Sequence, residues 1–68
     1  MVNANKFRAK MVENGYTQKS LAAASGMNEN TLGAKINGKA FFDTREVDTL
    51  CDLMHIDEPA EKCDIFLA

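Results

Sequence analysis

One segment, from Gln18 to Gly38, constrains the fold of this chain more than any other part of it. Apolar side chains recur there at helical spacing on both sides of a break that reads Ser-Gly-Met. The apolar or small positions are Leu21, Ala22, Met27, Leu32 and Ile36. This pattern predicts two short helices that each bury one face and are joined by a tight turn.

Two helices that cross steeply through a short turn containing Gly form a helix-turn-helix, whose second helix can enter the major groove of DNA. The pattern therefore favours a DNA-reading protein over an enzyme. No nucleophile–base pair, glycine-rich phosphate loop or metal-ligand spacing occurs in the sequence. We expect no catalytic residue, no bound cofactor and no metal.

The length of 68 residues allows a single domain, residues 1–68. A domain of this size buries only about 60% of the surface that its unfolded chain exposes, so its stability is modest unless it oligomerises. The Asn- and Lys-rich start lacks the apolar stretch of a secretion signal, and no apolar run approaches the roughly 20 residues that span a bilayer. We expect a cytoplasmic protein without membrane contact.

The net charge of −2 hides an uneven distribution of charge along the chain. The part up to Phe42 carries +4, and the part from Asp43 onward carries −6. This division predicts a positive face for phosphates and a negative far side, although ordinary solvated helix surface is the alternative. The same two alternatives apply to three cations near the start, Lys6, Arg8 and Lys10.

The two cysteines do not form a disulfide framework. Cys51 and Cys63, taken together with His55, would supply only three metal ligands and lack the usual C-x2-C spacing. We therefore expect reduced, half-buried cysteines on helices.

The first half of the chain predicts three helices. Residues 3–14 carry Phe7 and Met11 on one face, and Asn14-Gly15 is a typical helix end. Thr17 is predicted to cap a helix of about residues 18–24. Asn28 is predicted to cap a helix of about residues 29–36, which ends at Asn37-Gly38.

The second half predicts two more helices after an apolar loop at residues 40–42. Asp43 and Glu46 have the spacing of a capping box for a helix of about residues 44–54. Its inward positions are predicted to be Val47, Leu50, Leu53 and Met54. Ile56 should anchor the next turn, and Asp57 is the expected N-cap of a brief helix through about residue 64, with Pro59 in its first turn.

Large apolar residues gather at the C-terminal end, in Ile65, Phe66 and Leu67. They either complete the core or form an edge that binds a partner. For Ile65 and Phe66 we favour burial in the core. For Leu67 we favour a contact with a second subunit. Phe66 and Leu67 are both kept as candidate dimer or partner contacts.

The motif Q-x-x-L-A-x-x-x-G-M-N-x-x-T-L-x-x-x-I-N-G resembles the helix-turn-helix of the Cro and repressor proteins of temperate phages, the XRE family. The resemblance implies an all-α, compact five-helix domain of the lambda-repressor-like type. The helix-turn-helix, at about residues 17–37, would be helices two and three, and the acidic C-terminal helices and apolar tail would occupy about residues 43–68. The stretches F-R-A-K-M-V-E-N-G-Y-T-Q, N-E-N-T-L-G-A-K-I-N-G-K and D-I-F-L are similar to short Gram-positive phage and prophage regulators, which include Cro-like proteins and modulators of repression.

The resemblance also implies roles for individual residues. The side chains toward base edges would be Glu29, Asn30, Gly33 and Ala34. The phosphate contacts would be Thr17, Gln18, Lys19, Asn28, Thr31, Lys35, Asn37 and Lys39. In the major groove, Asn30 would pair with adenine N6 and N7, Glu29 would accept from cytosine N4, and Ala34 would touch a thymine methyl group.

The function implied is sequence-specific transcription regulation of the Cro or repressor type, with a recognition helix of about residues 28–36. The partner would be a double-stranded DNA operator, bound by a homodimer at half-sites about one helical turn apart. The alternative is a protein-binding modulator of a larger phage repressor, which would use the same fold as a scaffold. The acidic second half and the apolar end of the chain motivate this alternative.

Overall fold

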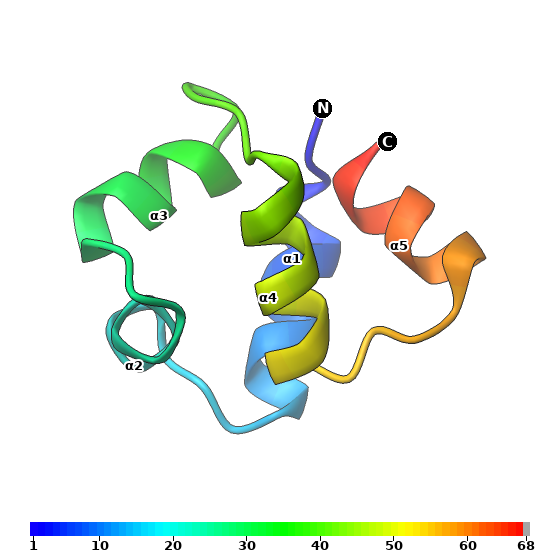
Figure 1. The fold of residues 1–68 in the computed structure, drawn as a ribbon, viewed down its shortest axis with the longest axis horizontal. Helices are drawn as coiled ribbons and strands as arrows, with labels where there is room; N and C mark the ends of the chain where they lie inside the picture. Colours follow the sequence, from blue (N-terminus) through cyan, green and yellow to red (C-terminus); the bar gives the residue numbers. More distant parts are fainter. Residues whose placement is uncertain (68) are drawn as a thin grey trace.

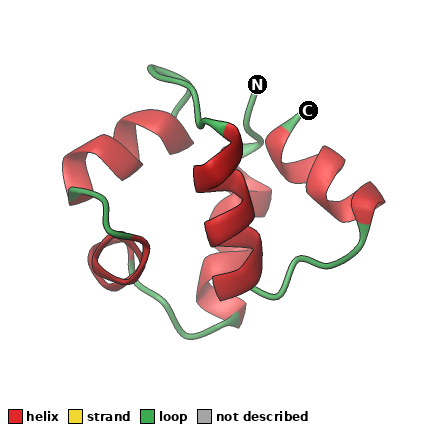
Figure 2. Ribbon diagram, viewed as in Figure 1, coloured by secondary structure: helices red, strands yellow, loops and turns green. Residues whose placement is uncertain are grey.

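The computed structural model describes residues 1–67, and over this range the chain forms five helices joined by short loops (Figure 1). The helices are α1 (Ala4–Glu13), α2 (Gln18–Ser25), α3 (Glu29–Ile36), α4 (Thr44–Leu53) and α5 (Pro59–Phe66). Figure 2 shows helices and loops alone in this part of the chain. The all-α, five-helix fold predicted from the sequence is confirmed.

The helices are arranged so that α3 lies at the opposite end of the molecule from α5 (Figure 1). Helix α2 packs against α3 and α4, whereas α5 packs against α1. The two ends of the chain lie beside each other, and the amide of Asn3 donates to the carbonyl of Ile65 at 2.7 Å. The acidic last helix therefore stays away from the helix-turn-helix.

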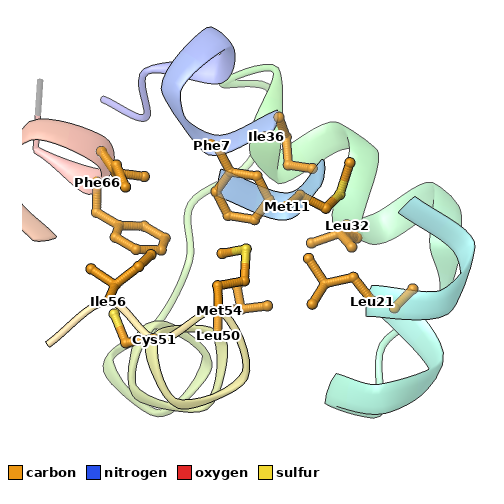
Figure 3. Packing of buried hydrophobic residues seen from close by; sticks show 12 residues of the cluster. Phe7, Met11, Leu21, Leu32, Ile36, Leu50, Cys51, Met54, Ile56 and Phe66 are labelled. Atoms are coloured by element: carbon orange, nitrogen blue, oxygen red, sulfur yellow. The ribbon is translucent and has the colours of Figure 1, made fainter. Parts of the chain in front are cut away.

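One apolar cluster, with residues from all five helices, forms the core (Figure 3). Its buried members are Phe7, Met11, Leu21, Ala22, Leu32, Ile36, Leu50, Cys51, Met54, Ile56, Ile65 and Phe66. The ring of Phe7 stacks on that of Phe42 at 5.8 Å between centroids, and Phe66 meets both rings edge-on. This trio joins α1, the loop before α4 and α5 around one point.

The C-terminal apolar residues divide between core and surface. Ile65 and Phe66 are buried, whereas the side chain of Leu67 is 73% exposed. The ring of Phe66 packs inside against Phe7 and Phe42, so its candidate role as a dimer or partner contact is limited to the edge that lines the apolar groove beside Leu67. Leu67 stays available for such a contact.

The predicted helix caps are confirmed for α2, α3 and α4. The hydroxyl of Thr17 accepts from the Ser20 amide at 3.0 Å, and the Asn28 side chain accepts from the Asn30 amide at 2.8 Å. Asp43 and Glu46 form a reciprocal capping box at the start of α4. Local sequence alone positions these three starts, because each cap bonds within three residues of itself.

The start and end of α5 differ from the prediction. Glu58, not Asp57, is the N-cap and makes no side-chain cap bond, and the helix continues to Phe66. Pro59 at the first helical position sets this start, because its fixed φ suits a helix and it has no N–H that a cap would need to satisfy. The apolar pair Ile65 and Phe66 extends the helix by packing its last turn into the core.

The two cysteines lie in different environments. Cys51 is buried and Cys63 is exposed, so the expectation that both are half-buried is wrong for each. Burial raises the pKa of the Cys51 thiol above its ordinary value and keeps it protonated. Of the inward positions predicted in α4, Leu50 and Met54 are fully buried, and Val47 and Leu53 are partly buried.

His55 follows α4 with a φ of 55°, in the left-handed region that glycine occupies after other helices of this chain. The Ile56 amide donates to the Cys51 carbonyl at 2.9 Å, which is the bond of a Schellman turn. We expect His55→Gly to raise the free energy of unfolding by about 0.5–1 kcal/mol, since a side chain is strained in this conformation. Urea denaturation tests this, and an unchanged or lowered midpoint would contradict it.

Candidate nucleic-acid interface

Helix α3 has one fully buried face and an exposed first turn. Leu32 and Ile36 are completely buried against the core, while Glu29, Asn30 and Thr31 are exposed. The Asn28 cap fixes where this turn begins. The first turn thus offers polar side chains to an outside partner, and its free amides and helix dipole favour an anion beside it.

Gly33 is buried, and the side chain that covers it is Gln18 from α2. A Cβ at residue 33 would lie 2.6 Å from Nε2 of Gln18, closer than real contacts allow. Gly33 therefore lets the Gln18 side chain lie across α3, and it does not present a surface to a base. Its predicted base contact is not supported by this burial.

Gln18 uses its side-chain amide inside the protein. Its Nε2 donates to the Glu29 carbonyl at 3.2 Å, and its Oε1 accepts from Nη1 of Arg8 at 3.2 Å. The half-buried Gln18 thus connects the starts of α2 and α3. The side-chain amide of Gln18 has two N–H groups, and one of them already donates to Glu29. The predicted phosphate contact of Gln18 can therefore use only the other N–H.

Lys35 does not have the exposed ammonium that the predicted phosphate contact needs. Its Nζ lies 2.6 Å from both carboxylate oxygens of Glu46, and its side chain is only 15% exposed. This ion pair joins the last turn of α3 to the first turn of α4. We therefore leave Lys35 out of the candidate phosphate contacts.

The other predicted contact residues lie on the surface around α2 and α3. Exposed side chains are those of Thr17, Lys19, Asn28, Thr31, Asn37 and Lys39. Ala34 is half-buried. The hydroxyl of Thr17 and the amide nitrogen of Asn28 can still donate, because their cap bonds use only oxygen acceptors.

Ion pairs separate the cations of the chain into two sets. The paired cations within residues 1–67 are Lys6 with Asp64, Lys10 with Glu61 and Glu13, Lys35 with Glu46, and Lys62 with Asp48. Within the same range, the cations without a carboxylate partner are Arg8, Lys19, Lys39 and Arg45. Lys19 and Lys39 lie in α2 and just beyond α3, and Arg8 bonds to α2.

The acidic second half therefore neutralises cations away from the helix-turn-helix, with Lys35 as the exception. The positive face predicted from the charge division would therefore rest on Lys19, Lys39 and Arg8, fewer cations than the net charge of the first half suggests.

Across residues 1–67, no helix is long and apolar enough to cross a membrane. No three His, Cys, Asp or Glu side chains of this range come together as they would around a metal ion.

Two short crossed helices with a buried inner face and an exposed polar turn define a helix-turn-helix DNA-binding domain. Residues 6–61 match the Cro/C1-type HTH DNA-binding domain, and the chain belongs to this family. Its partner is therefore DNA, and its type is regulatory rather than enzymatic. Comparisons with curated proteins and with solved structures gave no significant match.

Proposed function

We propose that this chain is a sequence-specific transcription regulator of the phage Cro or repressor type, with α3 in the major groove of its operator. The observation that supports this most directly is the exposed first turn of α3 on a helix whose other face is locked in the core. A major groove about 12 Å wide admits a helix presented in this way.

The base-reading residues of the proposal are Glu29, Asn30 and Ala34. The Asn30 amide suits adenine, which offers an acceptor and a donor side by side, and the methyl group of Ala34 suits thymine. The Glu29 carboxylate suits a cytosine amine, and it costs affinity wherever no such amine is opposite it. The proposed site therefore favours A·T pairs next to a cytosine.

The phosphate contacts of the proposal are the exposed residues around α2 and α3. They are Thr17, Lys19, Asn28, Thr31, Asn37 and Lys39. Hydroxyl, amide and ammonium donors of this kind fix the position of a protein on the duplex, but they carry no sequence information.

Lys39→Gln should weaken binding to all DNA sequences alike and reduce the slope of log K against log[salt] by about 1. The reason is that Lys39 is exposed and has no carboxylate partner among residues 1–67, so its charge is available to a phosphate. Fluorescence anisotropy at several salt concentrations measures both effects. Lys62→Gln is the matched control, since Lys62 pairs with Asp48 in α4, and equal slopes for the two variants would contradict the assignment.

The direct test of the proposed function is a gel shift with DNA that flanks the gene of this protein. The expected result is a complex that resists competitor DNA of unrelated sequence and dissociates as salt rises. Absence of any such complex at low ionic strength would overturn the proposal.

We also propose that the regulator acts as a homodimer. An apolar groove of about 210 Å³ lies beside the end of α3, and its lining includes Gly38, Phe41 and Leu67. Phe41 and Leu67 are 87% and 73% exposed and line the same groove, and exposed apolar surface gathered in one place marks an interaction site. Two copies joined there would hold two α3 helices at a fixed spacing, as paired half-sites require.

The same groove supports the second candidate, a modulator that binds a larger phage repressor. Sedimentation equilibrium of the protein alone distinguishes the two candidates. A dimer that Leu67→Ser dissociates supports the homodimer. A monomer that shifts no DNA but co-purifies with the repressor supports the modulator.

A further inference from the structure

The three cations of α1 contact different helices. Lys6 and Lys10 reach α5, where they pair with Asp64 and Glu61 at 3.9 and 3.3 Å. Arg8 instead bonds to α2, where its Nη1 donates to Oε1 of Gln18 at 3.2 Å. Arg8 is therefore the cation of α1 that belongs to the helix-turn-helix side of the domain.

The bond from Arg8 fixes the orientation of the Gln18 amide. Because the guanidinium occupies the oxygen of this amide, the nitrogen points toward α3, where it donates to the Glu29 carbonyl at 3.2 Å. The missing side chain of Gly33 leaves the space that the amide occupies. Arg8, Gln18 and Glu29 thus form a chain of bonds that holds the starts of α2 and α3 together.

The bond to Gln18 leaves the positive charge of Arg8 without a neutralising carboxylate among residues 1–67. A guanidinium has five N–H donors, and the structure gives Arg8 one bond, to a neutral acceptor. Among residues 1–67 no carboxylate pairs with it. A half-buried cation with spare donors beside the start of α2 is suited to a phosphate oxygen, which guanidinium binds through parallel N–H groups.

We propose that Arg8 is a DNA-contacting residue, which binds a backbone phosphate beside the start of α2 and at the same time positions Gln18 against the recognition helix. This inference rests on the proposed function and adds α1 to an interface otherwise built from α2, α3 and the residues that follow α3.

The test compares Arg8→Gln with Lys6→Gln, which removes the same charge from the same helix. Affinity for operator DNA is measured by fluorescence anisotropy across a range of salt concentrations, with thermal unfolding as a check on folding. Arg8→Gln should lower affinity about tenfold at low salt and reduce the salt slope by about 0.9, the contribution of one phosphate. Lys6→Gln should leave the slope as it is in the unchanged protein.

Arg8→Lys separates the two roles of the residue. It keeps the charge, so the salt slope should stay within error of the unchanged protein, but it loses the planar group that holds Gln18. The side-chain amide resonances of Gln18 should therefore move toward those of an exposed glutamine. Arg8→Lys tests the positioning role even if Arg8→Gln does not fold, and in that case Arg8→Met replaces Arg8→Gln in the measurement of the salt slope.

Each result has one meaning. If the unchanged protein binds its operator and Arg8→Gln retains the full salt slope, or if Lys6→Gln loses as much slope, the inference is overturned and the proposed function stands. If Arg8→Lys leaves the Gln18 resonances in place, the positioning role is overturned. If the unchanged protein binds no DNA, the proposed function fails and this inference fails with it.

Discussion

Phe7→Ala should lower the free energy of unfolding by about 3–5 kcal/mol, the usual cost of deleting a buried aromatic ring. The Phe7 side chain has no exposed surface, and its ring contacts those of Phe42 and Phe66. A domain of this size rarely has more than about 3–5 kcal/mol of stability. Most of the variant should therefore be unfolded at 25 °C, as measured by circular dichroism in urea.

Phe41→Ala is the matched control for this prediction. Phe41 is the same residue type in the loop before α4, but 87% of its surface is exposed. Its replacement should change stability by less than about 0.5 kcal/mol in the monomer. If the two variants were equally stable, the aromatic trio would not be the centre of the core.

Asn30→Ala should cost about 1–3 kcal/mol of binding free energy, and the cost should fall on a single base pair of the operator. The Asn30 side chain is exposed in the first turn of α3, and its backbone amide is already held by the Asn28 cap. Its side-chain amide is thus available for a base edge without loss of helix structure. Competition binding against an operator series with one substitution each measures the effect.

Asn5→Ala provides the control, because Asn5 is an exposed residue of the same type on α1. It should leave both the affinity and the sequence preference unchanged. A uniform loss across all operators in Asn30→Ala would contradict base reading, since it is the signature of a phosphate contact.

The sequence predicted the helices well because their signals are local. Thr17, Asn28 and Asp43 each cap a helix through bonds to residues two or three positions away. The apolar spacing of Leu32 and Ile36 likewise gives the buried face of α3 without any knowledge of its neighbours. The prediction was wrong at both ends of α5, because Pro59 competes with the Asp57 cap signal at its start and Ile65 and Phe66 extend its end by packing into the core.

The contacts between helices could not be predicted from local pattern. The family resemblance implies a phosphate contact for Lys35, but the folded chain places a carboxylate oxygen of Glu46 in α4 at 2.6 Å from its Nζ. Gly33 has an exposed position in the motif, but the Gln18 side chain from α2 covers it. Lys6 and Arg8 are both cations in the first half of α1, and the sequence does not distinguish their roles. In the folded chain Lys6 pairs with Asp64 of α5, whereas Arg8 donates to Gln18 of α2.

The acidic pI of about 5.2 is compatible with DNA binding, because the acidic residues pair mostly with cations that lie away from the helix-turn-helix. Affinity for DNA depends on cations placed at phosphates, not on the net charge of the chain. Three of the four cations without a carboxylate partner among residues 1–67, namely Arg8, Lys19 and Lys39, lie on or next to the helix-turn-helix. Most of the remaining cations are paired away from it.

The central claim is that the exposed first turn of α3 enters the DNA groove. Backbone amide chemical shifts, followed by NMR while an operator duplex is added, test it most directly. The largest changes are expected at residues 28–34 and at the start of α2, with small changes in α4 and α5. If the largest changes instead lay in α5, or around Phe41 and Leu67, with residues 28–34 unaffected, α3 would not be the recognition helix.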